Sequence, residues 1–292
     1  MANEKEIGYL NYLVKQYEGV TKLITASLQR LQSLPGETPD ADFDSMLKGQ
    51  CNALGVKEPG LELVKDRISR EIIKELKQWD IWTLWLKHIP GIGPAIAGKL
   101  IMLFYYRFIP ICKDCGGVLR KEETTDEGQA KKTLVCEDCG KKADKEGLLK
   151  HRTEERDFAT ISKWWAFMGR HTVDGVMPKR KKGTLANWST PGRTIGYQVG
   201  DQWNRQKEDH PYKAFLLERK RKHAINHPEW SKGHIHNAAR NEAVKLFLSH
   251  FWVVARTLDG KEISEPYAGA IMGHTNIVKP FYWEEEREVK TA

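Results

Sequence analysis

Apolar residues recur with a helical period in two stretches of the chain before residue 90. In residues 4–33 they fall at alternating three- and four-residue steps, with Ser27 on the same seam, which is the spacing of a coiled coil. A second period starts after the break at Pro59-Gly60 and continues to Ile89. We predict an antiparallel helix pair, residues 4–33 against residues 61–88. The spacing leaves open whether the seam closes within one chain or between the two chains of a homodimer.

The second period runs directly into Ile89-Pro90-Gly91-Ile92-Gly93-Pro94, which is typical of a helix-hairpin-helix turn. Gly91 and Gly93 permit a positive φ, and Pro94 suits the first turn of the outgoing helix. Backbone amides of such a turn point outward together and bind anions. We therefore expect Gly91, Gly93 and Lys99 to contact the phosphates of a nucleic acid. The alternative is a helical corner that serves only packing.

Four of the five cysteines form two similar motifs, Cys112-Lys113-Asp114-Cys115-Gly116 and Cys136-Glu137-Asp138-Cys139-Gly140. Two Cys-x-x-Cys turns at this separation are typical of a zinc ribbon. Disulfides or a redox pair would need an oxidising compartment or a thioredoxin-like βαβ context, and neither is visible in the sequence. We predict that a structural zinc ion is bound, with no position left for a catalytic water, by Cys112, Cys115, Cys136 and Cys139.

Helical periods return beyond residue 155. Amphipathic patterns cover residues 158–168, 194–207, 211–224 and 235–258, and residues 264–292 are predicted to be irregular, with their aromatic side chains packed on the body. Two basic clusters accompany these helices. They comprise Lys179, Arg180, Lys181 and Lys182, and Arg219, Lys220, Arg221 and Lys222. We expect both clusters to contact phosphates, and the alternative is an ordinary solvated surface.

Positive charge is concentrated in the second half of the chain. Residues 151–292 hold 24 Lys and Arg against 17 Asp and Glu, a net charge of +7 out of +8 for the whole chain, which favours a polyanionic partner. The best apolar stretch, residues 96–111, contains Lys99 and Arg107 and is too short to span a membrane. The N-terminus has no signal-peptide pattern. We expect a cytoplasmic protein whose partner is DNA, with RNA as the open alternative.

Candidate catalytic residues are few. His171 and Asp174 lie beside the first basic cluster and can form an acid–base pair, but no third member is visible. Thr172 is the only hydroxyl residue between Gly169 and Gly183, and a threonine is a poor nucleophile without a dedicated base. A phosphate-binding Gly-x-x-x-x-Gly-Lys-Ser/Thr motif is not found in the sequence, so nucleotide hydrolysis is not indicated.

Several motifs occur in a characteristic order along the chain: Ile89-Pro90-Gly91-Ile92-Gly93-Pro94 with Ala97, Trp164-Trp165-Ala166-Phe167-Met168-Gly169, Lys181-Lys182-Gly183, and Gly233-His234-Ile235-His236-Asn237-Ala238-Ala239-Arg240. This order resembles the C-terminal transposase domain of the insertion-sequence recombinases that use a bridge RNA. It is more similar to the stand-alone relatives of that domain in phages and mobile elements. The resemblance covers roughly residues 1–33, 61–108 and 155–258, and it implies DNA binding in recombination.

The sequence also departs from that family. Full-length members begin with a RuvC-like domain that supplies four acidic catalytic residues, whereas this chain starts at the coiled-coil segment, and we expect that domain to be absent. The nucleophilic serine of the family has no counterpart between Gly169 and Gly183. We therefore expect a nucleic-acid-binding protein rather than an enzyme. The alternatives are an active recombinase or nuclease that works with a partner chain, and a structural or assembly protein.

The predicted fold is mainly α with a small inserted β module. Residues 1–60 form the coiled-coil helix and a loop, and residues 61–108 form the second helix and the helix-hairpin-helix. Residues 109–145 form the zinc ribbon, and a charged connector covers residues 144–156. Residues 155–292 form a helical, transposase-like domain with an irregular tail.

Overall fold

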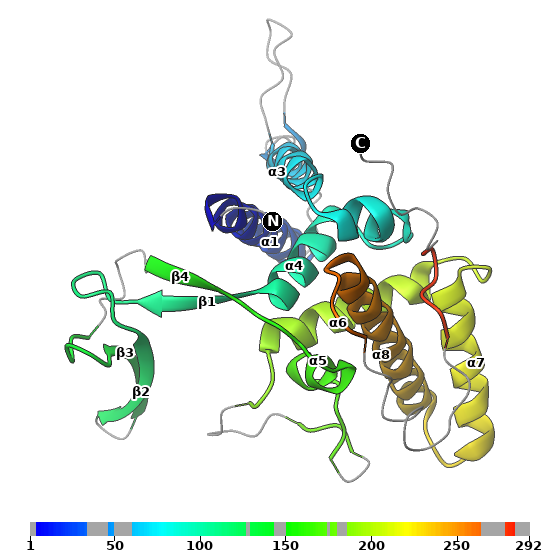
Figure 1. Ribbon diagram of the computed structural model, residues 1–292. Helices are drawn as coiled ribbons and strands as arrows, with labels where there is room; N and C mark the ends of the chain where they lie inside the picture. The colour runs from blue at the N-terminus through cyan, green and yellow to red at the C-terminus, as the bar shows by residue number, and fades with distance from the viewer. Residues whose placement is uncertain are drawn as a thin grey trace, which may run out of the picture. The chain divides into compact units, whose positions relative to one another are not determined.

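The computed structural model describes residues 4–33, 46–49, 60–126, 129–142, 150–173, 176–179, 186–263 and 278–283. The chain is mainly helical, as predicted (Figure 1). It divides into two compact units: unit 1 comprises Met1–Leu100 and Phe158–Ala292, and unit 2 comprises Ile101–Asp157. The helical elements are α1 (Glu4–Gln32), α3 (Leu61–Leu76), η1 (Ile81–Trp85), η2 (Leu86–His88), α4 (Pro94–Tyr105), α5 (Ile161–Phe167), α6 (Thr190–Arg205), α7 (Pro211–Asn226) and α8 (Lys232–Leu258).

In unit 1, α1 packs against α3. Burial raises the pKa of Glu75, near the end of α3, and the next cause is the carboxylate of Glu6, near the start of α1. The start of α1 therefore lies beside the end of α3, as in an antiparallel pair. Within this single chain the seam buries Leu10, Leu13 and Ile24. A homodimer through α1 stays a prediction.

The second helix is shorter than predicted. It ends at Leu76, and the chain continues through the π-helical turn η1 and the 3₁₀ turn η2. Trp82 lies three residues after Trp79 and four before Leu86, so apolar positions continue at helical spacing, and this pattern does not reveal that α3 ends at Leu76. Trp85 is fully buried, and its ring stacks on Phe247 with 5.8 Å between the ring centroids.

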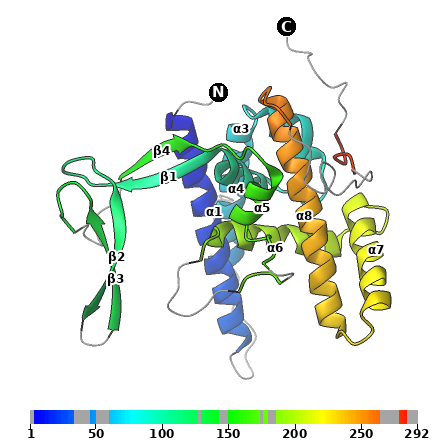
Figure 2. The ribbon, with the colours of Figure 1, turned by 60° about the horizontal axis from the view of Figure 1, so that its bottom comes forward.

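The long helix α8 organises the rest of unit 1. It contacts η1, α5, α6 and α7, and Figure 2 shows it running alongside α7. Three of these helices begin at a residue whose hydroxyl accepts a hydrogen bond from the first turn, which satisfies an otherwise unpaired amide. The capping residues are Thr160 of α5, Ser189 of α6 and Ser231 of α8.

Part of the C-terminal tail packs on this body, as predicted. The Phe281 ring lies edge-on to Tyr212, with 4.9 Å between the centroids. The Phe281 carbonyl accepts a hydrogen bond of 2.7 Å from Nε1 of Trp85. Phe281 thereby attaches this part of the tail to the body of unit 1.

Unit 2 is built from two antiparallel strand pairs. β1 (Tyr106–Ile111) pairs with β4 (Lys150–Glu155), and β2 (Leu119–Asp126) pairs with β3 (Gln129–Cys136). The prediction of a connector over residues 144–156 was wrong for Lys150–Glu155, which forms β4. A strand made of Lys, His, Arg, Thr and Glu shows no apolar alternation, so periodicity alone does not identify it.

Candidate metal centre and basic interface

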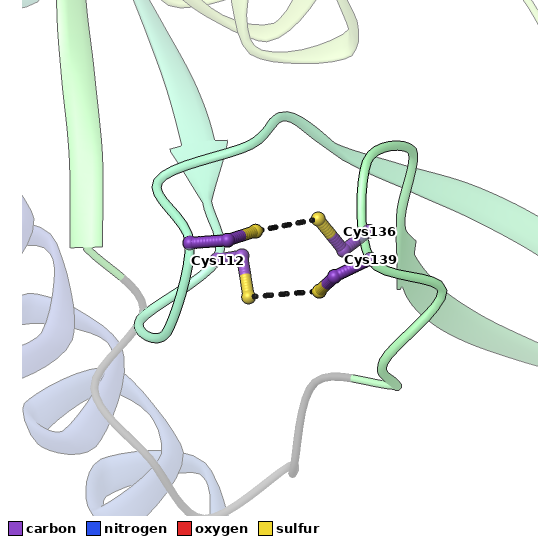
Figure 3. A group of neighbouring side chains, drawn as sticks. Cys112, Cys136 and Cys139 are labelled. Atoms are coloured by element: carbon purple, nitrogen blue, oxygen red, sulfur yellow. Dashed lines mark hydrogen bonds between the residues drawn. The ribbon is translucent and has the colours of Figure 1, made fainter.

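The two Cys-x-x-Cys turns of unit 2 face each other (Figure 3). Cys112 follows β1 and Cys136 ends β3, and the Sγ atoms of all four predicted cysteines lie within 4.8 Å of one another. The Sγ–Sγ distances are 3.8 Å from Cys112 to Cys139 and 3.4 Å from Cys115 to Cys136, far beyond the roughly 2.05 Å of a disulfide. A tetrahedral site with metal–sulfur bonds of about 2.3 Å has sulfur–sulfur edges of about 3.8 Å. The four cysteines can therefore hold a metal ion.

The backbone shapes both turns in the same way. Gly116 and Gly140 adopt positive φ values of 77° and 68°, and their amides donate to the carbonyls of Cys112 and Cys136 at 3.1 and 3.0 Å. Backbone amides, that of Cys115 first, lower the pKa of Cys112 to about 7. Backbone amides also lower the pKa of Cys136. Both effects favour the thiolate, which is the form that binds metals.

The hairpin turn of unit 1 is packed against α6. The outgoing helix α4 begins at Pro94, as predicted, and Gly91 has a φ of 89°. A Cβ at Gly91 would lie 2.9 Å from Nε2 of Gln206 and 3.1 Å from Cβ of Gln202, so the absence of a side chain lets α6 approach closely. Gly93 does not have the positive φ that its position suggested.

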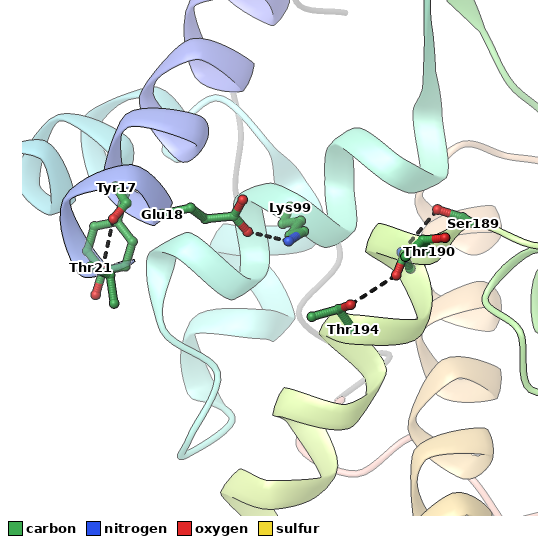
Figure 4. A network of polar contacts seen from close by, with 8 residues as sticks. Tyr17, Glu18, Thr21, Lys99, Ser189, Thr190 and Thr194 are labelled. Atoms are coloured by element: carbon green, nitrogen blue, oxygen red, sulfur yellow. Dashed lines mark hydrogen bonds and ion pairs between the residues drawn. The ribbon is translucent and has the colours of Figure 1, made fainter. Parts of the chain in front are cut away.

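Lys99 is engaged within the chain. Its Nζ forms an ion pair with the carboxylate of Glu18 on α1 (Figure 4), and only 15% of its side chain is exposed. Its charge is balanced and shielded, so Lys99 does not present a free cation to a phosphate. Gly91 and Lys99 thus both make contacts within unit 1.

The predicted basic clusters are only partly described. Lys179 is exposed. In the α7 cluster, Nε of Arg219 lies 3.2 Å from the Glu242 carboxylate, and Lys220 is half-buried. The exposed members of that cluster are Arg221 and Lys222. Outside the described residues lie Arg180, Lys181 and Lys182.

The structure describes two of the three candidate catalytic residues, His171 and Thr172. Asp174 lies outside the described residues. Thr172 is exposed, and among the described residues no hydrogen bond joins it to His171. The Nδ1 atom of His171 is buried without a hydrogen-bond partner in the same part of the chain, and its ring lies edge-on to Trp188 at 6.3 Å. An acid–base role for His171 stays a prediction.

Three arginines from different segments meet at α6. Arg170 is only 5% exposed, and its guanidinium donates to Oδ1 of Asn241 and to the Arg193 carbonyl, both at 3.0 Å. Burial, then the charge of Arg193, then that of Arg240 lower the pKa of Arg170 to about 10. No carboxylate is among the described groups that shift the pKa of Arg170.

The positive charge continues across α6, α7 and α8 around His236. Burial lowers the pKa of His236, followed by the charges of Lys220 and Arg240. Lys213 also lowers the pKa of His236, whereas the carboxylate of Asp201 raises it. Asp201 also forms an ion pair with Arg205 at 2.7 Å. We call the following five residues the basic face: Arg170, Arg193, Lys213, Lys220 and Arg240.

Of this face, the sequence pattern predicted only Lys220, although the sequence also contains a signal for Arg170 and Arg240. Gly192, Gly196 and Gly200 recur at every fourth position of α6, and this spacing places them on one side of a helix. A Cβ at Gly196 would lie 2.7 Å from a terminal nitrogen of Arg170, and one at Gly200 would lie 2.6 Å from Cγ of Arg240. These glycines provide the space in which the two arginines lie.

Comparisons of the chain with protein-family models, with curated proteins and with solved structures find no match. In the part of the chain that the structure describes, no helix has both the length and the apolar character needed to cross a membrane.

Proposed function

We propose that this protein binds the phosphate backbone of DNA through the basic face on α6, α7 and α8. The observation that carries the proposal is the buried Arg170, which lies beside Arg193 and Arg240 with no carboxylate among the described groups that shift its pKa. Positive charges held together without a countercharge repel one another and oppose the compact state. A polyanion supplies that countercharge and releases its own counterions when it binds.

Aromatic rings support two of these cations. The guanidinium of Arg193 lies over the Trp188 ring at 4.9 Å, and that of Arg240 lies over the Tyr197 ring at 4.0 Å. Such cation–π contacts restrict the arginine side chains before a ligand arrives. Less conformational entropy is then lost on binding, so the arrangement favours phosphate contacts that position a strand without reading its sequence.

The cysteine cluster has a structural role in this proposal. We assign zinc to Cys112, Cys115, Cys136 and Cys139, because four thiolates suit its preference for tetrahedral sulfur ligands. Four protein ligands leave no open position for a catalytic water. The ion would hold together a ribbon whose buried core is a small set of side chains, comprising Cys112, Leu119 and Cys136 with the partly buried Leu134.

We further propose, from the resemblance to a transposase domain, that this binding serves DNA recombination. We propose binding rather than strand cleavage, because the sequence contains no counterpart of the family's serine between Gly169 and Gly183. Cleavage of a DNA strand in the presence of Mg²⁺ would instead indicate a recombinase or nuclease.

Fluorescence anisotropy with labelled oligonucleotides tests the proposal. The logarithm of the affinity should fall linearly with the logarithm of the salt concentration, by about 0.9 for each phosphate contacted in a duplex. Arg240→Gln and Lys220→Gln should each reduce that slope by about one contact. The matched control is Lys22→Gln, which removes an exposed charge from α1 and should leave the slope unchanged.

Two outcomes would contradict the proposal. An affinity that does not change with salt would exclude a phosphate interface. Equal slopes for the wild type, Arg240→Gln and Lys220→Gln would place the interface elsewhere on the protein. An RNA oligonucleotide of the same sequence belongs in the same series, because a clear preference for RNA would change the ligand while retaining the basic face.

A further inference from the structure

An exposed aromatic residue lies beside Arg240 of the basic face, and the fold does not require its position. Tyr197 lies on α6 and is 53% exposed. The neighbouring Ile195 and Val199 on the same helix are buried, with only 2% and 1% of their surface exposed. The hydrophobic face of α6 is thus filled without it. Single exposed aromatic residues are common on protein surfaces, so the surroundings of Tyr197 decide whether it has a role.

Those surroundings are cationic. The guanidinium of Arg240 lies over the ring of Tyr197 at 4.0 Å, and Nη2 of Arg240 donates to Oδ1 of Asn237 at 2.8 Å. The stem of Arg240 lies against Gly200, where a Cβ would come within 2.6 Å of Cγ. Three contacts therefore hold the arginine, and it covers the ring while leaving more than half of the tyrosine accessible.

An aromatic surface of this kind suits one class of nucleic acid. The bases of a duplex are stacked on one another, so a duplex offers phosphates but no free base face to a tyrosine. An unpaired base presents a π-face that stacks on an aromatic ring, and its flanking phosphates can contact neighbouring cations. The combination of Tyr197 with the basic face thus favours an unpaired strand.

We propose that Tyr197, held by Arg240, is a base-stacking position and that the preferred ligand of the basic face is single-stranded DNA. This inference rests on the proposed function, because the stacking position needs the neighbouring phosphate contacts. It adds a preference for unpaired over paired strands that the phosphate contacts alone do not provide.

Anisotropy titrations with a single-stranded oligonucleotide and with its duplex test this assignment. Tyr197→Ala should weaken binding of the single strand by about 5- to 150-fold. Duplex binding should weaken much less, because Asn237 and Gly200 still hold Arg240, and the salt slope should stay close to that of the wild type. Tyr197→Phe, which keeps the ring, should restore single-strand binding. Tyr12→Ala is the matched control, because Tyr12 is 54% exposed on α1 and is not part of the basic face.

The outcomes separate the two proposals. Equal losses for single strand and duplex in Tyr197→Ala would mean that tyrosine acts only by holding Arg240, and no loss for either would mean that it does not contact the ligand. Both results overturn the stacking assignment and leave the phosphate interface standing. A wild-type protein that binds neither oligonucleotide at low salt overturns the proposed function and this inference together.

Discussion

Gly196 of α6 lies directly against the guanidinium of Arg170. A Cβ at Gly196 would stand 2.7 Å from Nη2 of that arginine, closer than such contacts occur in proteins, and 3.0 Å from its Nε. Arg170 has little freedom to retreat, since it is 5% exposed and donates to Asn241 and to the Arg193 carbonyl. A glycine at position 196 is therefore needed for the guanidinium of Arg170 to lie against α6.

Gly196→Ala should destabilise unit 1 and weaken anion binding. Moving the Arg170 guanidinium breaks hydrogen bonds of a buried charged group, which costs about 1–3 kcal/mol. This loss outweighs the gain of about 0.5–1 kcal/mol that alanine normally brings inside a helix. Urea unfolding followed by tryptophan fluorescence measures the free energy, and anisotropy with DNA measures the loss of affinity.

Gly19→Ala is the control for this substitution. Gly19 lies inside α1, and a Cβ at that position meets no atom within 4 Å. The substitution should therefore raise the free energy of unfolding by about 0.5–1 kcal/mol. If Gly196→Ala raised it by the same amount, the close approach of Arg170 to α6 would not be a constraint.

Local signals in the sequence predicted many elements but few of the contacts between them. The start of α4 at Pro94 and the cysteine cluster follow from backbone and ligand chemistry that acts over a few residues. The pairing of β1 with β4 and the burial of Arg170 depend on residues distant in sequence, whose proximity no local pattern encodes. Lys99 shows the same limit, because only the packing of α4 on α1 reveals that Glu18 balances its charge.

Lys99→Gln should affect stability without affecting the salt dependence of DNA binding. The pair with Glu18 is partly shielded, with 15% and 33% of the two side chains exposed, so its loss should cost about 1 kcal/mol. Unfolding in urea measures this cost, and the anisotropy slope should match that of the wild type. If the salt dependence of DNA binding fell by the equivalent of about one phosphate contact, Lys99 would belong to the phosphate interface.

His250 should make the stability of unit 1 depend on pH. It is 2% exposed, and burial lowers its pKa to about 4 from the usual 6.5. Its Nε2 lies 3.0 Å from the Val278 carbonyl, which can only accept, so Nε2 carries the proton. In the neutral ring Nδ1 then accepts from the Tyr212 hydroxyl at 2.8 Å, and burial favours this neutral form.

The direction of the pH effect follows from this depressed pKa. As the pH falls below 6.5, His250 becomes protonated in the unfolded chain but stays neutral in the folded chain. The free energy of unfolding therefore decreases down to about pH 4, where the folded chain is protonated too, and changes little below that. The full contribution is about 3 kcal/mol, measured as the free energy of unfolding between pH 7 and pH 4. His250→Gln should be less stable at pH 7 and should lose this part of the pH dependence. If the free energy of unfolding of His250→Gln changed with pH as it does in the wild type, other groups would be responsible for the pH dependence.

Removal of the metal should unfold unit 2 and leave unit 1 folded. All ten tryptophans lie outside residues 101–157, so tryptophan emission reports on unit 1, whereas trypsin cleavage at the many Lys and Arg residues of 101–157 reports on unit 2. The purified protein should contain one zinc ion per chain, because structural zinc provides folding energy that a small ribbon lacks. A chelator or Cys136→Ser should therefore expose unit 2 to trypsin without shifting the emission.

Cys51→Ser, which removes the cysteine outside both motifs, should change neither measurement. Resistance of unit 2 to trypsin after complete zinc removal would show that its strands fold without the ion.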